Sequence, residues 1–256
     1  MNDLEAQLNA NAPVPSQFSE TYSLPKTIRS LMTPESPTIA LTNPSQSLNA
    51  LSGLVVMSWH SMPTKTSSVL EKTLWNKSFF VLALNRWLKT HDGEIDDSTM
   101  LLFHLSSIVL NTKMIDIHSL VHNLLRNGAM PAIPEAISQW HHSDHGKIAA
   151  LHAGELIQAA QRIVLSQRPK ANTKFTFANE GFPPSALGEG PHSAICVYLA
   201  VLVLWTTQAA SEPPDWVVAG AAIKRGCNIL SQFKLRIAGI LKSTLRLLGD
   251  KVALEL

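Results

Sequence analysis

Histidine is the residue type whose spacing in this sequence comes closest to a chemical site. One stretch holds a cluster of histidines: His141, His142, His145 and His152. A His-x-x-His spacing at the start of a helix can supply metal ligands, and zinc would need a further group, for which Asp144 and Glu155 are nearest. The alternative is a solvent-exposed turn with Asp144 near a helix N-terminus, where a carboxylate is favourable. We favour this alternative because short motifs of this kind often match by chance.

Other candidates for catalysis are weaker. His118 and His122 share a helix face, but the only carboxylate near them is Asp116. The His-Asp-Gly tripeptide at 91–93 resembles the His-Asp pair of some metal-dependent phosphohydrolases, yet a glycine after a helix is more often its C-terminal stop. The chain has neither a Gly-x-Ser-x-Gly nucleophile elbow nor a phosphate-binding Gly-x-x-x-x-Gly-Lys loop. We therefore expect that the protein is not an enzyme, and we assign no catalytic, cofactor-binding or metal-binding residue.

The two cysteines, Cys196 and Cys227, fall within apolar helical patterns. Free cysteine is among the most buried residue types, so we expect two reduced thiols in the core. No Cys-x-x-Cys pair occurs, and the sequence therefore contains no zinc finger or zinc cluster.

The elements that would position these side chains are organised around the stretch from His145 to Trp205. Its first half predicts an amphipathic helix with apolar residues at helical steps: Ile148, Leu151, Leu156, Ala159 and Ile163. A break rich in proline and glycine follows over residues 166–191, and connections of that length are usually functional or disordered. The second half, from Pro191 onward, is apolar nearly all round, which predicts a helix buried on every side. The sequence thus predicts an all-α fold in which several helices pack around a buried central helix.

The composition agrees with a helical interior. Apolar residues make up 45% of the chain and charged residues 16%, and the net charge is +2. So small a charge gives no argument for nucleic-acid binding. The best membrane candidate, Ala194 to Trp205, is well short of the roughly 20 residues that a spanning helix needs, so no membrane partner is expected. Acidic residues come early at the N-terminus without an apolar segment, so no signal peptide is expected either.

The spacing of prolines divides the chain into an arm and a helical domain. Residues 1–43 contain repeated prolines among Ser, Thr and Asn, which predicts a flexible N-terminal arm with one short turn near Thr27 to Met32. Asn43 and Pro44 have the residue types of a helix start. Residues 44–256 are therefore expected to form the helical domain.

Capping residues mark the starts of further helices. The sequence from Ser68 to Glu71 matches a capping box, and a long helix with two apolar faces is expected after it. Asp96 and Asp97 place carboxylates at the start of the next helix, where the helix dipole favours them. Shorter helices are expected over residues 115–126 and 135–140.

A last helical region is predicted from Trp216 onward. It is expected to continue on one apolar stripe: Ile229, Phe233, Ile237, Ile240, Leu241, Leu245 and Leu248. The only extended piece expected in the chain is short, over residues 174–177.

Part of the central stretch resembles a known family. The residues that carry the resemblance are the run HAGELIQAAQR from His152 to Arg162, a proline-bearing gap, and the run PHSAICVYLAVLVLW from Pro191 to Trp205. They resemble the C-terminal part of the fungal-specific transcription factor domain, the regulatory region of fungal zinc-finger regulators. In that family a helix of the form HA-x-x-hydrophobic-x-x-A-R precedes a proline-flanked helix that ends in Leu-Trp. Over the earlier helices the resemblance holds only in outline.

The resemblance implies the regulatory domain of a nuclear transcription factor, all-α in fold. Such a domain modulates transcription by RNA polymerase II through protein contacts and does not read bases itself. Its implied partners are other transcription regulators or coactivators, with a homodimer as an open alternative, and it implies no catalytic residues and no cofactors. Family members usually carry a zinc-binding, DNA-reading module before this domain, and the sequence contains none. DNA contact is therefore expected only through a zinc module outside this sequence, as in a fragment of a longer zinc-finger protein.

Two functions of other classes stay open as alternatives. One is a helical metal-dependent hydrolase with its site between His141 and His152. The other is a membrane-associated helical protein that uses the run from Ala194 to Trp205. Regulation itself would be compatible with a small-molecule effector in a helical pocket, and burial of the central helix would place Cys196 and Tyr198 in the floor of that pocket.

Overall fold

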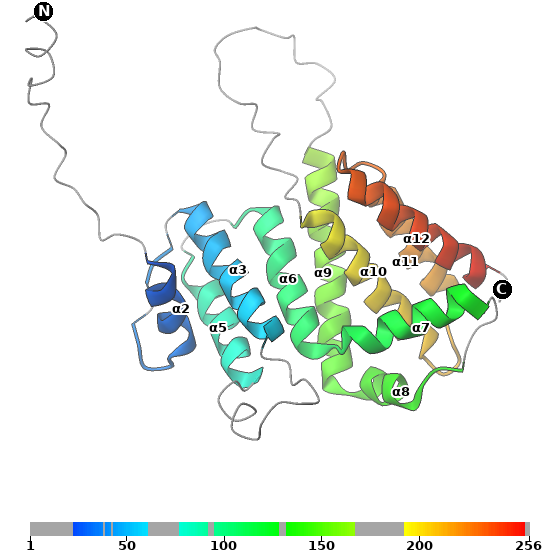
Figure 1. Cartoon of the computed structure of the whole chain (residues 1–256), viewed down its shortest axis with the longest axis horizontal. Helices are drawn as coiled ribbons and strands as arrows, with labels where there is room; N and C mark the ends of the chain where they lie inside the picture. Colours follow the sequence, from blue (N-terminus) through cyan, green and yellow to red (C-terminus); the bar gives the residue numbers. More distant parts are fainter. Residues whose placement is uncertain are drawn as a thin grey trace, which may run out of the picture.

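Within the ranges that the structure describes, every regular element is a helix, and the predicted all-α fold is confirmed (Figure 1). The structure is a computed structural model that describes residues 23–37, 39–41, 43–60, 77–91, 95–127, 132–166 and 192–253. In chain order the helices are α2 (Leu24–Met32), α3 (Pro44–His60), α5 (Lys77–Lys89), α6 (Asp97–Asn111), α7 (Met114–Asn127), α8 (Glu135–His142), α9 (Asp144–Ser166), α10 (Ser193–Ala209), α11 (Trp216–Leu230) and α12 (Arg236–Val252).

The predicted central helix is confirmed as α10. Its side chains are nearly all buried, and both Leu202 and Trp205 are completely inaccessible to solvent. The helix contacts α6, α7, α9, α11 and α12. Each Å² of apolar surface removed from water contributes about 25 cal/mol, so a helix that is apolar all round is most stable at the centre of a bundle.

The N-terminal and C-terminal helices lie on opposite sides of a pair formed by α6 and α9 (Figure 1). On one side, α2, α3 and α5 pack on one another, and α3 and α5 also pack on α6. On the other side, α10, α11 and α12 pack together beside α9. The α6–α9 pair is also joined by an ion pair, in which Arg162 lies 2.7 Å from Asp97. The helices α7 and α8 lie across one end of this arrangement, at the bottom of the view.

The predicted boundary between a flexible arm and a helical domain at residue 43 is wrong for the described part of the arm. Residues Leu24–Met32 form α2, which packs on α3 and α5 and buries Thr27 and Leu31. Pro25 lies in the first turn of this helix, where proline costs no hydrogen bond and its fixed φ suits the helix. Prolines that appeared to break structure therefore start a helix that belongs to the packed body.

The guanidinium of Arg86 on α5 fixes the segment that follows α2. It donates hydrogen bonds to the carbonyl oxygens of Ser30 at 3.2 Å and Pro34 at 2.7 Å, and also to that of Ser36. Hydrogen bonds that involve a charged group are about twice as strong as those between neutral groups. This one side chain thus supplies hydrogen-bond donors to one carbonyl group in the last turn of α2 and to two in the turn after it.

The apolar face of α9 differs from the predicted one. Ile148 and Leu151 are 41% and 63% exposed, although both were expected on the buried face. The buried face instead begins with small residues: Gly146, Ala149 and Ala153. Small side chains let helix backbones approach closely, and α9 makes its main contacts with α6 and α10.

The prediction of a single apolar stripe along one C-terminal helical region is also wrong, because residues 231–235 interrupt the helix. The interruption produces two helices, α11 and α12, that pack on each other. After the break the helical register starts anew, so Ile237 and Ile240 are 41% and 60% exposed. Leu245 and Leu248 on the same helix are fully buried, as expected.

Two predicted helix starts are confirmed by their capping bonds. One carboxylate oxygen of Asp96 accepts a hydrogen bond from the backbone N–H of Thr99 at 2.9 Å, and the other accepts from the Thr99 hydroxyl. The side-chain oxygen of Asn43 accepts from the backbone N–H of Ser45 at 2.8 Å, just before α3. The predicted capping box at 68–71 and the extended piece at 174–177 lie outside the described residues.

Candidate functional site

A cavity of about 560 Å³ lies where α3, α5, α6, α7, α8 and α9 meet. Cavities of a few hundred to a thousand Å³ are the usual size for small-molecule sites in proteins. Four buried apolar side chains contribute to its wall: Phe80, Val109, Ile117 and Ile137. The cavity therefore offers an apolar surface that a drug-sized organic molecule could cover.

Three polar side chains from different helices meet in the lining of this cavity. Lys77 of α5 donates a hydrogen bond to the side-chain oxygen of Asn111 of α6, with Nζ and Oδ1 3.0 Å apart. Nδ1 of His145 of α9 lies 3.0 Å from Lys77 Nζ and 3.0 Å from Asn111 Oδ1. We call these residues the polar triad of the cavity. A few converging polar groups in an otherwise apolar pocket are typical of ligand sites.

The orientation of Asn111 is fixed from the helix side. Its Nδ2 donates a hydrogen bond to the Ser107 carbonyl oxygen one turn earlier, at 2.8 Å. The amide oxygen is therefore the atom left to face Lys77. The Asn111 carbonyl oxygen accepts a hydrogen bond from the indole N–H of Trp140 at 2.8 Å, which ties α8 to the end of α6.

Lys77 is the charged member of the polar triad. Burial lowers the pKa of its ammonium group below the usual value, because desolvation disfavours the charged form. Among the described residues, no carboxylate forms an ion pair with Lys77. Lys113 and Asp116 also line the cavity, so its lining contains both signs of charge.

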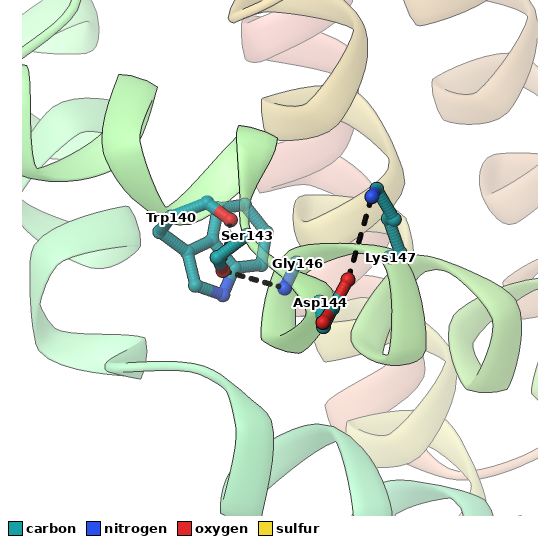
Figure 2. Close-up of polar contacts among 5 residues, drawn as sticks. All are labelled: Trp140, Ser143, Asp144, Gly146 and Lys147. Atoms are coloured by element: carbon teal, nitrogen blue, oxygen red, sulfur yellow. Dashed lines mark hydrogen bonds and ion pairs between the residues drawn. The ribbon is translucent and has the colours of Figure 1, made fainter.

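The sharp corner between α8 and α9 positions Trp140 at the end of one helix (Figure 2). His145 lies in the first turn of the other helix. Ser143 is the single residue between the two helices, and its hydroxyl donates to the Trp140 carbonyl oxygen at 2.6 Å while accepting from the backbone N–H of Gly146 at 3.2 Å. Gly146 packs directly on the end of α8, since an added Cβ would lie 2.9 Å from the His141 carbonyl oxygen and closer still to that of Trp140. Any larger residue at this position would therefore have to displace these backbone carbonyl groups. Lys147 and Asp144 add an exposed ion pair at 3.4 Å on the outer side.

The structure divides the histidines of the predicted cluster among three places. His142 donates from Nδ1 to the Ser138 carbonyl oxygen within α8, and its ring lies edge-on to that of His141. His145 belongs to the polar triad, whereas His152 lies further along α9 against α6. In the described part of the chain, no three His, Cys, Asp or Glu side chains are grouped so that they could hold a metal ion.

The remaining histidine candidates take structural positions. The ring of His118 packs edge-on against Tyr198 of α10. His91 follows the end of α5, where one ring nitrogen lies 2.9 Å from the Trp87 carbonyl oxygen and the other 2.5 Å from the Ser47 hydroxyl oxygen. Asp92 and Gly93, the other members of that tripeptide, lie outside the described residues.

A histidine pair at the α6–α9 interface, of buried His104 and half-buried His152, was not predicted from the sequence. The Nδ1 atoms of His104 and His152 lie 2.9 Å apart, and Phe103 packs edge-on against both rings. Burial lowers the pKa of His104 to about 4, with smaller contributions from His152 and Arg162, and burial also lowers the pKa of His152. Both rings are therefore neutral near pH 7, and one donates to the other. The signal in the sequence was a lone polar ring inside the apolar run of α6.

The central helix does not contribute to this cavity, so the predicted pocket floor of Cys196 and Tyr198 is wrong for it. Cys196 is fully buried among the neighbours of α10, and burial raises the pKa of its thiol to about 12. Cys227 is half-buried, and both thiols are free.

Among the described helices, none is both long and apolar enough to cross a membrane alone. The pair α6 and α7 meets the criteria of length and composition when taken together, with a bend of 88° between the two helices.

Comparisons of the chain with protein-family models, with curated proteins and with solved structures give no match. The resemblance to the fungal regulatory domain therefore stays a prediction.

Proposed function

We propose that this chain is an effector-responsive regulatory domain that acts on transcription through protein contacts. The observation that carries the proposal is the cavity of about 560 Å³ with its apolar wall and its polar triad. Such a combination is the default arrangement of a ligand site in an all-α domain, where sites form between helices.

The position of the cavity supports a regulatory role. Its lining comes from six helices, and the polar triad connects the start of α5, the end of α6 and the start of α9. A ligand shifts a conformational equilibrium only by its difference in affinity between two states. A ligand that contacts several helix ends at once can have such a difference, because any relative movement of those helices changes its contacts.

The resemblance supplies the transcriptional part of the proposal. The two runs that resemble the fungal regulatory domain correspond to α9 and α10, which pack together at the centre of the bundle. On this proposal the domain is not an enzyme, resides in the nucleus, and binds other regulators or coactivators, with self-association as an alternative. DNA would be read by a zinc module supplied outside this sequence.

The proposal is tested by fusing the full chain to a heterologous DNA-binding module upstream of a reporter gene in fungal cells. We expect reporter output to differ several-fold from that of the module alone. Ala136→Trp would place a large ring at the cavity lining from an exposed position on α8, and we expect it to change the output.

Ala221→Trp is the matched control, because Ala221 is an exposed alanine on α11 that does not line the cavity. It should leave the output of the fusion unchanged. Output equal to that of the DNA-binding module alone, at equal protein level, would refute the proposal. Equal output from the Ala136→Trp fusion and the unchanged fusion would refute the role of the cavity.

A further inference from the structure

We propose that the cavity binds a small organic carboxylate, whose acid group meets Lys77 and His145 while its apolar body lies against the cavity wall. The inference deepens the proposed function by naming the class of effector, and its regulatory meaning rests on that function. Binding itself is measured independently of transcription.

The hydrogen-bond inventory of the polar triad indicates an anion. An ammonium group carries three N–H donors and no acceptor. Two donors of Lys77 are directed to Asn111 Oδ1 and His145 Nδ1, which leaves the third without an acceptor among the described residues. Lys77 Nζ can only donate and Asn111 Oδ1 can only accept, so His145 Nδ1 can form a hydrogen bond with only one of them at a time. When Nδ1 accepts from Lys77, the proton of the neutral ring is on Nε2.

In that tautomer Nε2 of the exposed His145 ring provides a second donor, and no described residue accepts from it. The two unused donors belong to neighbouring side chains of the same cavity. A carboxylate has two oxygens that accept hydrogen bonds, so it can take one from each residue. A neutral carbonyl oxygen could also accept two hydrogen bonds, but it carries no negative charge to pair with Lys77, and an amine would place donor against donor.

The charge of Lys77 also favours an anionic ligand. Lys77 is half-buried, desolvation lowers its pKa, and no carboxylate of the described chain pairs with it. Burying an unpaired charge is costly, and an incoming carboxylate would compensate that cost. The lining contains two lysines, Lys77 and Lys113, and one carboxylate, Asp116, so its net charge is +1.

The apolar part of the ligand follows from the wall. Phe80, Val109, Ile117 and Ile137 are each at most 3% exposed and offer no hydrogen-bonding group from their side chains. The indole of Trp140 also lines the cavity, with its N–H already bonded to Asn111. A ligand that is polar along its length would leave its own groups unsatisfied there. The ligand class is thus a monocarboxylate with an aliphatic or aromatic body.

The test uses the purified full chain and three probes of equal length: 4-phenylbutyrate, 4-phenylbutanol and 4-phenylbutylamine. Isothermal titration calorimetry gives their affinities, and the change in total tryptophan fluorescence, to which Trp140 of the lining contributes, follows occupancy of the cavity. We expect the carboxylate to bind at least tenfold more tightly than the alcohol or the amine. Equal affinity of the three probes, or no binding of the carboxylate, would overturn the inference.

Variants assign the preference to the proposed residue. Lys77→Met keeps the apolar stem but removes the donors, and we expect it to weaken carboxylate binding at least tenfold while alcohol binding stays the same. Lys77→Arg should restore part of the lost affinity. Lys89→Met, an exposed lysine at the other end of α5, is the control and should bind like the original protein. Thermal melting shows whether each variant is folded, and a folded Lys77→Met protein with full affinity would contradict the inference.

The two proposals fail separately. A carboxylate that binds through Lys77 without changing reporter output would leave the inference standing and remove the regulatory function. If the fusion regulates the reporter but the purified chain shows no preference for carboxylates, the regulatory function stands and the inference about the ligand is wrong.

Discussion

At the scale of single residues, the neutral pair of His104 and His152 links the stability of the fold to pH. The pKa of His104 is lowered from 6.5 to about 4 in the folded protein, so the unfolded chain binds more protons between these values. The stabilising contribution is complete above pH 6.5 and is lost as the pH falls toward 4. We expect the free energy of unfolding to fall by on the order of 2–3 kcal/mol over this window.

Urea denaturation at pH 7 and at pH 4.5 measures this change. His104→Gln removes the titrating ring from α6, and the pH-dependent part of the unfolding free energy should shrink in this variant. His152, whose pKa is also lowered, contributes to the part that remains. An identical pH dependence in the original and the variant protein would show that the pair does not titrate in this way.

The sequence could not reveal these residue-scale sites, because their partners come from distant segments. His104 and His152 meet across two helices, and the polar triad takes one residue from each of α5, α6 and α9. Spacing along one helix predicts which residues share a face, but it does not predict which helices will meet. The cluster at 141–152 looked chemical only because its members are close in sequence.

At the scale of the elements, the α8–α9 corner depends on Gly146. Its backbone packs so closely on the end of α8 that alanine there must displace carbonyl groups of the helix. We expect Gly146→Ala to destabilise the protein by about 2 kcal/mol or more, because the contact is with backbone that cannot rotate away. Chemical denaturation measures the loss.

Gly154 offers a matched control on the same helix, since a Cβ there would meet nothing within 4 Å. Gly154→Ala should stabilise the protein by about 0.5–1 kcal/mol, because alanine has the higher helix propensity. If both substitutions changed the free energy of unfolding in the same direction, the steric explanation of the corner would be wrong.

The attachment of α2 through Arg86 is a second property of an element. Arg86→Ala removes the hydrogen bonds to the carbonyl groups of Ser30, Pro34 and Ser36 and leaves these groups without their donor. We expect a loss of about 1–3 kcal/mol in the local stability of the α2 segment. Limited proteolysis should cut this segment faster in the variant. In the control Lys89→Ala, which changes an exposed residue of α5, the protease should cut the segment at the original rate.

The sequence predicted where helices form better than it predicted which face of each helix is buried. The apolar run of α10 and the capping residues Asp96 and Asn43 gave correct predictions, because burial on all sides and capping are local properties. The faces of α9 and α12 were mispredicted at Ile148 and Ile237. A helix with apolar residues on two sides does not show which side its neighbours will cover.

At the scale of the whole molecule, stability should decrease outward from α10. This helix has helical neighbours along most of its surface, whereas α2 packs at one edge on α3 and α5. Amides of fully buried central helices usually exchange only through global unfolding, and those of edge helices through local opening.

Hydrogen exchange followed by mass spectrometry should therefore find the slowest exchange in α10 and the adjoining part of α9. The amides of α2 should exchange at least tenfold faster. Exchange in α10 as fast as in α2 would mean that the bundle does not unfold as one cooperative unit.

The small residues along the buried face of α9 have a consequence for anyone who redesigns this protein. Ala149, Ala153 and Ala160 are completely enclosed, so each added methylene there must push α6 or α10 away. Ile148 and Leu151 on the same helix are exposed, so larger side chains at these positions would not displace a neighbouring helix. A mutational library of α9 should therefore be limited by side-chain volume on one side, while the other side is free for polar residues that improve solubility.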